Sequence, residues 1–354
     1  MSFGNTLLNS IKKIKIFPST KKEWMRAILL WSSLLFLILA TGCYMVLMPG
    51  SSYQGSLPPL DSLTLELKAN IETHIRMLAE TIGERELHSH YKQLQQAADY
   101  VEKSFQSSGY TVNRQEFKVL GKSTYNLEVE ILGQTYPKEI VVIGAHYDSC
   151  EGTLGANDNG SGVASILELA RLFAKKPLSR TLRFVAFTNE EPPYFQTENM
   201  GSLVYARRCR ERQENITAMF SLETMGFYSE KEGSQFYPFP FNLYYPTKGN
   251  FIGFVGNLSS RSLVRKTVGS FRTLAKFPSE GVAAPNAISG IGWSDQWSFW
   301  QVGYSALMVT DTAPFRYPHY HTHEDTWEKV NYEATARVLA GLYLVFKEFV
   351  GESV

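Results

Sequence analysis

Apolar residues follow three different patterns along the chain, and the first of them is an uninterrupted stretch near the N-terminus. Residues 27–48 read AILLWSSLLFLILATGCYMVLM, which is 22 residues without a charged side chain. At about 1.5 Å per residue, a helix of this length crosses the roughly 30 Å hydrocarbon core of a bilayer. A core helix of a globular domain would show a polar side, which this stretch lacks. We therefore expect one transmembrane helix at 27–48.

Basic residues precede this stretch and predict its orientation. They are Lys12, Lys13, Lys15, Lys21, Lys22 and Arg26. Cytoplasmic flanks of membrane spans are enriched in Lys and Arg, so we expect residues 1–26 in the cytoplasm and the rest of the chain on the periplasmic, extracellular or lumenal side. A cleaved signal peptide is the alternative, because ATGC at 40–43 resembles a lipidation site and would leave Cys43 lipidated. The long basic region and the apolar residues after Cys43 favour an uncleaved, single-pass anchor.

The second pattern is helical spacing of apolar residues, which begins after a Pro/Gly/Ser-rich linker at 49–60, PGSSYQGSLPPL. Apolar residues recur every three to four positions in five segments, and this period predicts amphipathic helices. The expected helices are 61–81, 89–108, 163–175, 201–212 and 331–350.

The third pattern is a set of short runs rich in Val, Ile and Phe, which alternate with these helices. The expected strands are 126–132, 139–147, 181–190, 216–226 and 304–311. Apolar strands separated by helices are typical of a mostly parallel sheet covered by helices. We therefore expect one α/β domain at 61–354, with its functional groups beyond the carboxyl ends of the strands.

Polar groups of metal-ligand type follow these strands. The first strand end continues as HYDSCEGTLGANDNGSG at 146–162, with one imidazole, two aspartates and four glycines. The others follow at Glu190 and Glu191, at Glu223, and in the loop HYHTHEDT at 319–326. Any one of these residues is explained equally well as an ordinary loop or surface residue. Taken together they converge on one rim of the sheet, and this convergence indicates a site.

The residue types in this set indicate a metal. Carboxylates combined with two imidazoles suit zinc or a similar first-row metal. One carboxylate able to bridge, with two ligands on each side, describes a two-metal hydrolytic site with ions roughly 3.5–4 Å apart. A further glutamate beside a ligand glutamate would serve as the base that accepts a proton from the attacking water.

Composition and charge exclude other classes. The net charge of +1 gives no indication of a nucleic-acid partner, since such domains are strongly basic. The three cysteines, Cys43, Cys150 and Cys209, show no CxxC spacing, and a pairing of Cys150 with Cys209 stays open. A serine hydrolase would need a G-x-S-x-G elbow, which the sequence does not contain.

Six segments in a fixed order resemble those of the co-catalytic di-zinc aminopeptidases. They are HYDS, GANDNGSG, TNEEPPYF, SLETMG, SDQWSFWQVGYSA and YHTHEDT. Relatives of that family include glutamate carboxypeptidases, glutaminyl cyclases and the inactive transferrin-receptor ectodomain. The resemblance covers roughly residues 90–350. It implies a three-layer α/β/α fold with a central, mostly parallel mixed sheet, and a metallo-exopeptidase that acts on peptides with two zinc ions per chain.

The resemblance also implies a ligand set. By position, His146 and Glu223 are similar to the ligands of one zinc ion, and Glu191 and His321 to those of the other. Asp158 matches the carboxylate that bridges the two ions. Position 223 is glutamate where many members carry aspartate, and its extra methylene moves the carboxylate.

Three further residues receive roles by the same resemblance. Glu190 is similar to the general base, and Tyr320 to a residue whose hydroxyl approaches the developing oxyanion. Asp148 resembles the carboxylate that orients the imidazole of His146, as is common around metal-bound histidines. Gln296 stands where the family often has histidine, and no role is assigned to it.

Alternatives within this resemblance stay open. A single-zinc glutaminyl cyclase and a binding ectodomain without catalysis would share the fold, although here no ligand is missing. Carboxypeptidases of the family carry an inserted domain, for which residues 71–139 leave no room. The aromatic stretch YPFPFNLYYP at 237–246 is equally compatible with a surface loop and with the wall of a substrate pocket. The sequence gives no indication of oligomeric state.

Overall fold

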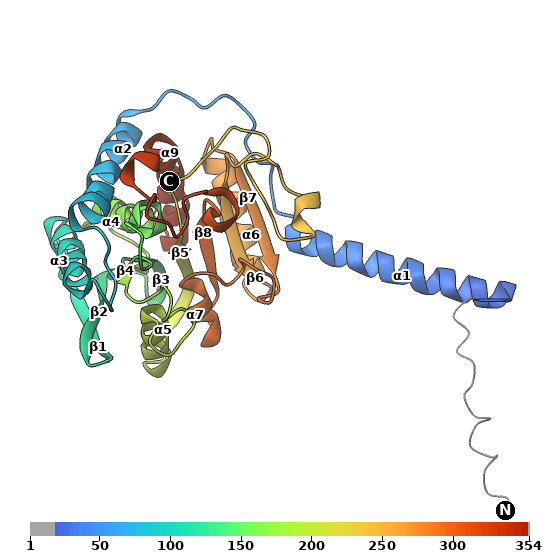
Figure 1. Ribbon diagram of the computed structural model, residues 1–354, viewed down its shortest axis with the longest axis horizontal. Helices are drawn as coiled ribbons and strands as arrows, with labels where there is room; N and C mark the ends of the chain where they lie inside the picture. The colour runs from blue at the N-terminus through green and yellow to red at the C-terminus, as the bar shows by residue number, and fades with distance from the viewer. Residues whose placement is uncertain (1–17, 353–354) are drawn as a thin grey trace, which may run out of the picture. The chain divides into compact units, whose positions relative to one another are not determined.

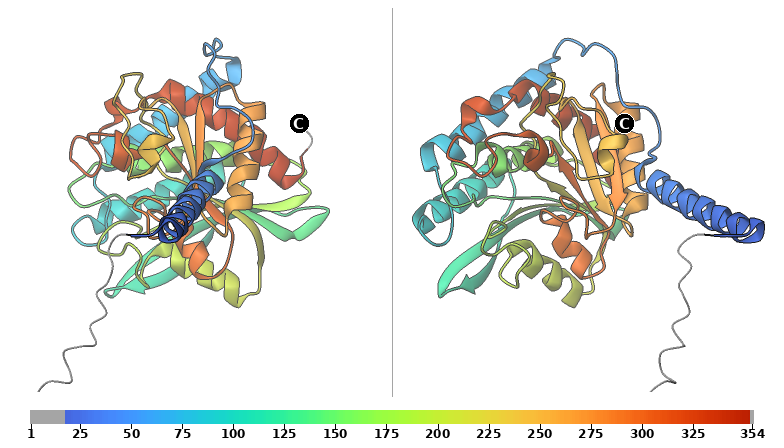
Figure 2. Two further views of the ribbon diagram at one scale, coloured as in Figure 1. Left: turned by 90° about the vertical axis from the view of Figure 1, so that its right-hand side faces the viewer. Right: turned by 45° about the vertical axis from the view of Figure 1, so that its right-hand side comes forward.

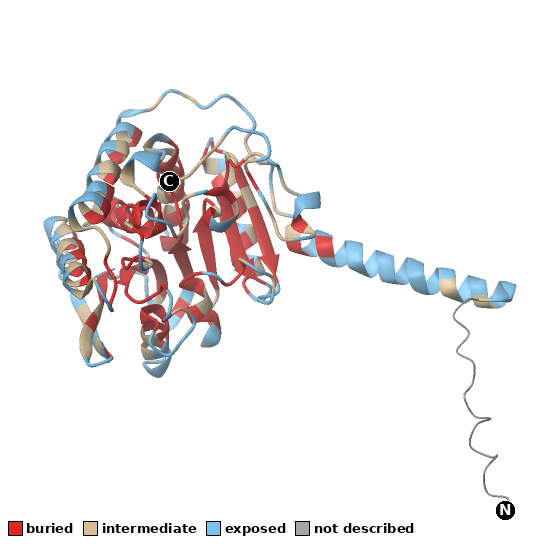
Figure 3. Ribbon diagram, in the orientation of Figure 1, coloured by how far each residue is buried: buried red, intermediate tan, exposed pale blue. Residues whose placement is uncertain are grey.

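The computed structural model describes residues 18–352, which divide into a unit that ends at Met45 and a larger unit that begins at Val46. The N-terminal unit consists of helix α1, Lys21–Val46, whose side chains are mostly exposed along its length (Figure 3). Its 26 residues reach about 39 Å, and its most apolar window has a mean hydropathy of 2.0. Among the described residues it is the one helix long and apolar enough to cross a membrane. It begins before the expected start at 27, and Lys12, Lys13 and Lys15 lie outside the described residues.

The larger unit is built on a sheet of eight strands in the order β1-β2-β4-β3-β5-β8-β6-β7 (Figure 1). Their bounds are β1 Asn113–Val119, β2 Lys122–Ile131, β3 Tyr136–His146, β4 Arg180–Phe187, β5 Asn215–Leu222, β6 Ile252–Asn257, β7 Ser279–Ala284 and β8 Ala306–Thr310. The central strands β4, β3, β5 and β8 run parallel, and β6 with β7 is also a parallel pair. Antiparallel pairs join β1 to β2, β2 to β4 and β6 to β8. The prediction of a mostly parallel mixed sheet is confirmed.

Helices cover both faces of the sheet (Figure 2). The helices are α2 Ser62–Ile75, α3 Tyr91–Ser107, α4 Gly162–Phe173, α5 Gly201–Glu211, α6 Arg261–Leu274, α7 Gln296–Gln301, α8 Ala313–Arg316 and α9 Tyr332–Val350. Shorter helical turns are Arg76–Ile82, Ala156–Ser161, Phe241–Leu243 and Trp327–Lys329. Helices α2, α3, α4, α6 and α9 pack on one face, and α5 with α7 on the other. The three-layer α/β/α fold is therefore confirmed.

The central strands are buried along almost their whole length, as Figure 3 shows. In β3, every residue from Ile140 to His146 is buried. Strands buried on both faces are continuous apolar runs rather than alternating ones, which is why the sequence pattern predicted them. The helices and strands that it did not predict are β1, β6, α6, β7, α7 and α8.

The segment predicted as a linker, 49–60, contains no helix or strand and lies along the larger unit. The Arg272 guanidinium donates to the carbonyls of Pro49 and Gly50, each at 3.1 Å. At the other end of the segment, Arg337 Nη1 donates to the carbonyl of Pro58 at 2.8 Å. The domain boundaries proposed from the sequence stay a prediction, and these contacts hold the segment against the domain.

The register of the sheet brings the candidate groups to one edge. His146, the last residue of β3, is paired with Phe187, the last residue of β4. Glu190 follows β4 by three residues, and Glu223 follows β5 directly. Because parallel neighbours end at the same edge of a sheet, loops from four strands meet there.

Candidate active site

Three of the predicted ligands form one group of donor atoms at the ends of β3 and β5. His146 Nε2 lies 2.7 Å from Glu223 Oε2 and 3.3 Å from Asp158 Oδ1. All three side chains are buried. Glu223 is held by Asn159 Nδ2 at 2.8 Å and by the Ser294 hydroxyl at 3.2 Å. The extra methylene of glutamate at 223 therefore still brings a carboxylate oxygen to the imidazole.

The other predicted ligands form a second group that shares Asp158. His321 Nε2 lies 3.1 Å from Asp158 Oδ2 and 3.2 Å from Glu191 Oε2. The two carboxylate oxygens of Asp158 thus face different histidines, Oδ1 toward His146 and Oδ2 toward His321. This is the arrangement in which one carboxylate can bridge two cations.

The donor atoms converge without hydrogen-bond geometry, which is how metal ligands lie. Among the described residues, three of these atoms are buried and have no hydrogen-bond partner: His146 Nε2, Asp158 Oδ1 and His321 Nε2. The same holds for Oε1, the other carboxylate oxygen of Glu191. Unpaired buried polar atoms are costly, and a shared cation removes this cost. Three carboxylates combined with two imidazoles suit zinc or a similar first-row metal. The residues present therefore fit the metal that the sequence predicted.

The charges in the site shift the pKa values in opposite directions. Burial raises the pKa of Glu191, and Asp158 raises it further, whereas the nearby imidazole of His321 lowers it, with a result of about 6. Burial also tends to raise the pKa of Asp158, but the nearby imidazoles of His146 and His321 outweigh it and lower that pKa. Asp158 is thereby kept ionised, as a metal ligand must be.

Glu190, the predicted general base, lies beside the first group. Its Oε2 is 3.8 Å from His146 Nε2, and its side chain is buried. Burial raises the pKa of Glu190 well above its usual range; Glu223 and Glu191 raise it further, and His146 acts in the opposite direction. A carboxylate with a raised pKa is suited to accept and return a proton near neutral pH.

Asp148 contacts the same groups mainly through the backbone. Its carboxylate accepts from the backbone N–H groups of Glu190 at 3.2 Å and Glu191 at 3.1 Å. The nearest oxygen to His146 Nδ1 is the Asp148 carbonyl at 3.2 Å, with the carboxylate at 3.6 Å. Asp148 thus lies where it can orient His146, and it also fixes the two glutamates that follow β4.

Tyr320 lies against the second group. Its ring is stacked on the imidazole of His321, with centroids 3.9 Å apart and planes at 17°. Burial raises the pKa of the Tyr320 hydroxyl, and the carboxylates of Asp158 and Glu191 raise it further. The phenol is therefore a proton-carrying donor at the mouth of an adjoining pocket.

That pocket is apolar and extends away from Glu223. Among the residues that line it are Tyr237, Phe241, Ile291, Trp293 and Phe315. The aromatic stretch 237–246 therefore contributes to a pocket wall, one of the two possibilities that the sequence left open. Phe239 of the same stretch is 79% exposed and is not one of the lining residues.

Two further residues, which the sequence did not indicate, position the ligand loops. Arg85 is fully buried, and its guanidinium donates to the carbonyls of Tyr147 at 2.7 Å, Leu154 at 2.7 Å and Gly155 at 2.8 Å. Asp325 accepts from the backbone N–H groups of Asn157 at 2.8 Å and Asp158 at 3.0 Å. Both act on the backbone around Asp158, so no side-chain spacing could reveal them. Asp325 does lie within the YHTHEDT segment that carries His321.

A further residue, Asp295, is buried, interacts electrostatically with His146 and has both carboxylate oxygens without hydrogen-bond partners among the described residues. Burial raises its pKa to about 7 despite the opposite effect of His146. Asp295 belongs to the SDQW segment, in which the family resemblance singled out Gln296, where the family often has histidine, and not Asp295. Gln296 is buried and donates to the carbonyl of Ile291 at 3.1 Å, which is a structural contact.

The cysteines do not pair. Cys43, Cys150 and Cys209 are free thiols, and Cys209 is buried on α5. A disulfide between Cys150 and Cys209 is therefore not present.

Comparison with known proteins agrees with this fold. The model of peptidase family M28 matches residues 126–345. The uncharacterized protein YfbL of Escherichia coli (strain K12) is 34% identical over 281 residues, which cover 77% of this chain and 85% of that protein. Among solved structures, BSAP, a zinc aminopeptidase from Bacillus subtilis, has a TM-score of 0.62 at 16% identity over 80% of this chain and 95% of its own. Porphyromonas gingivalis glutaminyl cyclase has a TM-score of 0.61 at 17% identity, covering 80% and 98%. The likenesses to these two solved structures concern the fold alone, whereas the family match and the likeness to YfbL concern the sequence itself. By its sequence, the chain belongs to peptidase family M28.

Proposed function

We propose that the chain is a membrane-anchored, zinc-dependent aminopeptidase that removes N-terminal residues from peptides with two metal ions. The observation that carries this proposal is the position of Asp158, whose two oxygens face His146 and His321 at 3.3 and 3.1 Å. A site of this form offers two metal positions joined by one carboxylate. Membership of a peptidase family and the likeness to a zinc aminopeptidase support the same reading.

The ligands divide between the two positions. His146 and Glu223 would hold one ion, Glu191 and His321 the other, and Asp158 both. When bound, the two zinc ions would polarise the scissile carbonyl and lower the pKa of a water molecule from about 15.7 toward 7. Asp148 keeps the imidazole of His146 and the backbone of Glu190 and Glu191 in place for this arrangement.

The proton is handled by Glu190. Its buried carboxylate lies beside the ligands without being assigned to either ion, and its raised pKa suits it to accept the proton of the attacking water. The same group then returns the proton to the departing amine. The Tyr320 hydroxyl, at the opposite side beside His321, is placed to donate to the developing oxyanion.

The apolar pocket beside Glu223 and Tyr320 would receive the first side chain of the substrate. Its aromatic lining suits a large apolar residue, because burial of such a side chain is favourable by about 1.5–3 kcal/mol. The pocket lies next to the ligands, so a side chain bound there leaves its peptide carbonyl near the site.

The test is metal content and hydrolysis of aminoacyl chromogenic amides by the full-length chain in detergent and by Glu190→Gln. We expect two zinc ions per chain in both, with kcat at least about a hundredfold lower in the variant, as for loss of a general base. Glu151→Gln, an exposed carboxylate in the neighbouring loop, is the matched control and should keep its activity.

A glutaminyl cyclase is the alternative that the same measurement separates. One bound zinc ion, together with cyclisation of peptides that begin with glutamine, would replace the aminopeptidase proposal. Absence of both tightly bound metal and turnover would instead favour a binding ectodomain. The two separate donor groups around Asp158 favour the two-metal hydrolase over either.

A further inference from the structure

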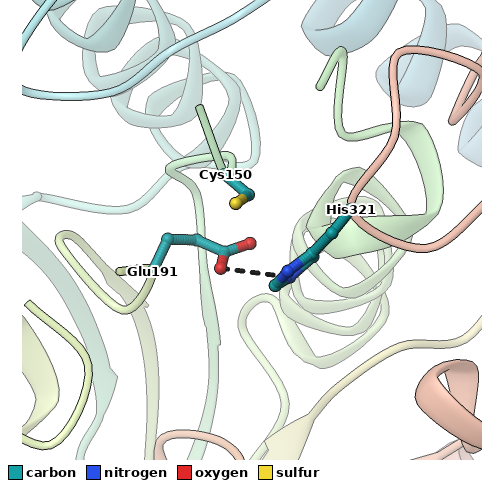
Figure 4. Close-up of side chains that lie close together, drawn as sticks. All are labelled: Cys150, Glu191 and His321. Carbon is teal, nitrogen blue, oxygen red and sulfur yellow. Dashed lines mark ion pairs between the residues drawn. The ribbon is translucent and has the colours of Figure 1, made fainter. Parts of the chain in front are cut away.

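Cys150 lies in the same cluster as two of the proposed ligands, although no role was expected for it. Its Sγ, a carboxylate oxygen of Glu191 and an imidazole nitrogen of His321 all lie within 4.8 Å of one another. Figure 4 shows the three side chains directed at one space, with the dashed line joining Glu191 to His321. Cys150 is partly exposed.

The loop that carries Cys150 is fixed by hydrogen bonds on both sides of it. The Cys150 carbonyl accepts from Thr153 N at 3.1 Å, and the Ser149 hydroxyl donates to the Thr153 carbonyl at 3.1 Å. The Ser149 hydroxyl also accepts from the backbone N–H of Arg85 at 3.1 Å. The sulfur is thereby held next to His321 by the same Arg85 that holds the backbone before Asp158.

A second observation, the unpartnered carboxylate oxygen of Glu191, indicates a cation beside Cys150. Glu191 is only 4% exposed, and its Oε1 has no hydrogen-bond partner among the described residues, while Oε2 lies 3.2 Å from His321 Nε2. The carboxylate that carries this unpartnered oxygen belongs to the three-residue group that contains the Cys150 sulfur. A neutral thiol gives weak compensation to such a carboxylate, whereas a metal ion compensates both.

Resting on the proposed function, we propose that Cys150 is a further ligand of the metal position formed by Glu191, His321 and Asp158. Bonds of about 2.0–2.3 Å to one tetrahedral zinc place neighbouring donors roughly 3.5 Å apart. Donors within 4.8 Å reach this spacing by a small side-chain movement. Cys150 would bind as the thiolate, and its proton would leave to solvent on metal loading.

The consequence is an asymmetric pair of metal positions. With Cys150, one position has four protein donors, so the scissile carbonyl would reach that ion only as a fifth ligand, an expansion that catalytic zinc sites allow. The position of His146 and Glu223 keeps three donors, Asp158 included, and thus an open place for the water. A sulfur donor also favours zinc or cobalt over manganese or magnesium at the four-donor position.

The experiment uses cobalt(II), because a cysteine thiolate bound to it gives an intense near-ultraviolet charge-transfer band that oxygen and nitrogen donors do not give. Full-length protein in detergent is loaded with cobalt, and its spectrum is compared with those of Cys150→Ser and Cys209→Ala. We expect the band in wild type, its loss in Cys150→Ser with the weak visible bands retained, and its retention in Cys209→Ala. We also expect a chelator to remove one of the two ions at least about tenfold faster from Cys150→Ser, since even loss of a supporting contact weakens metal sites by 10–100-fold.

Each other outcome overturns the assignment. Visible bands without the charge-transfer band in wild type would exclude sulfur ligation and leave the proposed two-metal hydrolase intact. A band that survives Cys150→Ser, or is lost in Cys209→Ala, would assign the sulfur elsewhere. Failure to bind any cobalt would overturn both proposals, whereas the expected spectra without peptide hydrolysis would overturn the proposed function alone. If Cys150→Ser does not fold, X-ray absorption of zinc-loaded wild type decides: one sulfur scatterer per two ions supports the ligand, and none excludes it.

Discussion

The position of Asp158, the proposed bridging ligand, depends on Asp325, which is not one of the proposed ligands. Asp325 Oδ1 accepts from Asn157 N and from the Tyr317 hydroxyl, each at 2.8 Å, and Oδ2 accepts from Asp158 N at 3.0 Å. Burial raises the pKa of Asp325 to about 7, although these backbone donors lower it. The Asp325 carboxylate therefore fixes the backbone at Asn157 and Asp158, and with it the direction of the Asp158 side chain.

We predict that Asp325→Asn weakens metal binding. The amide offers one acceptor oxygen and turns an NH2 group toward a backbone donor, so the loop around Asp158 must shift. Contacts that orient metal ligands are worth 10–100-fold in affinity, and we expect a loss of about that size in a chelator competition. Glu324→Gln, which changes the adjacent and exposed carboxylate, is the control. Equal affinities in the two variants would show that Asp325 does not position the bridge.

Residues of this kind explain what the sequence could and could not predict at the site. The proposed ligands are visible because each follows a strand end, and strand ends are visible as ends of apolar runs. Arg85 and Asp325 act through backbone carbonyl and N–H groups. Their partners depend on how the loops fold, which no spacing in the sequence records. Cys150 was visible within the HYDSC segment but lacked a partner until the fold placed His321 beside it.

At the scale of elements, the aromatic segment 237–246 shows how one insertion divides its side chains between solvent and pocket. Phe241 is 4% exposed and lines the pocket, whereas Phe239, two residues earlier, is 79% exposed. The Tyr245 hydroxyl donates to the carbonyl of Gly281 at 2.6 Å and ties the segment to β7. The segment is thus fixed to the sheet on its inner side.

We predict that Phe241→Ala lowers kcat/KM for substrates with a large apolar N-terminal residue by about tenfold or more, because roughly 2 kcal/mol of apolar contact is lost. Substrates that begin with alanine should be affected much less. The measurement is the ratio of the two kcat/KM values, which corrects for any loss of folded protein. Phe239→Ala should leave this ratio unchanged. A ratio that is equally insensitive to Phe241→Ala would place the first side chain outside this pocket.

Helices α2 and α4 are joined by the buried carboxylate of Glu168, whose ionisation depends on pH. Glu168 on α4 accepts from Asn70 Nδ2 at 2.9 Å and from Arg171 Nη2 at 2.8 Å, and lies 3.5 Å from His74 Nε2. Burial alone would raise the pKa of Glu168, but the contacts from His74, Arg171 and Asn70 outweigh it and lower the pKa to about 2. The folded state therefore favours the ionised form.

We predict that Glu168→Gln destabilises the domain by about 2 kcal/mol at neutral pH, as for loss of hydrogen bonds to a buried charge. A folded-state pKa below the ordinary 4.5 means that this stabilisation is complete above pH 4.5 and is lost as the pH falls toward 2. Urea midpoints of wild type and variant should therefore differ at pH 7 and converge between pH 4.5 and 2. The exposed Glu348→Gln on α9 is the control. A difference that persists at pH 2 would assign the effect to packing rather than charge.

The strands differ in how clearly the pattern of apolar residues in the sequence predicts them. Strands β3, β4, β5 and β8 are buried on both faces, and their apolar runs stand out. Strand β1 lies at the edge of the sheet and mixes exposed and half-buried residues, NRQEFKV. Strand β7, SEGVAA at the opposite edge, is built from small residues with no apolar period. Strand β1 gives a weak pattern because few of its positions face a core, whereas β7 is almost fully buried but has few large apolar side chains.

For the whole molecule, the question is whether α1 stays attached and anchors the chain. Its 26 residues are long and apolar enough to span a bilayer, and the larger unit that begins at Val46 is compact by itself. Lys21, Lys22 and Arg26 stand at its first turns. A signal sequence near an N-terminus passes the same test of length and composition. A cleaved signal and an uncleaved anchor are therefore distinguished by whether α1 is still present in the mature protein.

We predict that the chain stays in the membrane fraction after an alkaline carbonate wash, and that its intact mass includes α1, because a cleaved product would lack the apolar stretch. Replacing Leu35 and Leu37 by arginine should release it, since each charge at the centre of a span costs about 2.5–3.5 kcal/mol. Protease added to sealed cells from which any outer wall has been removed should digest the larger unit, since the basic flank stays in the cytoplasm. Leu65→Arg on the exposed side of α2 is the control for adding a charge elsewhere. A product whose mass begins at residue 43, whether soluble or held in the membrane by a lipid on Cys43, would instead establish a cleaved signal. Protection of the larger unit from protease would reverse the orientation.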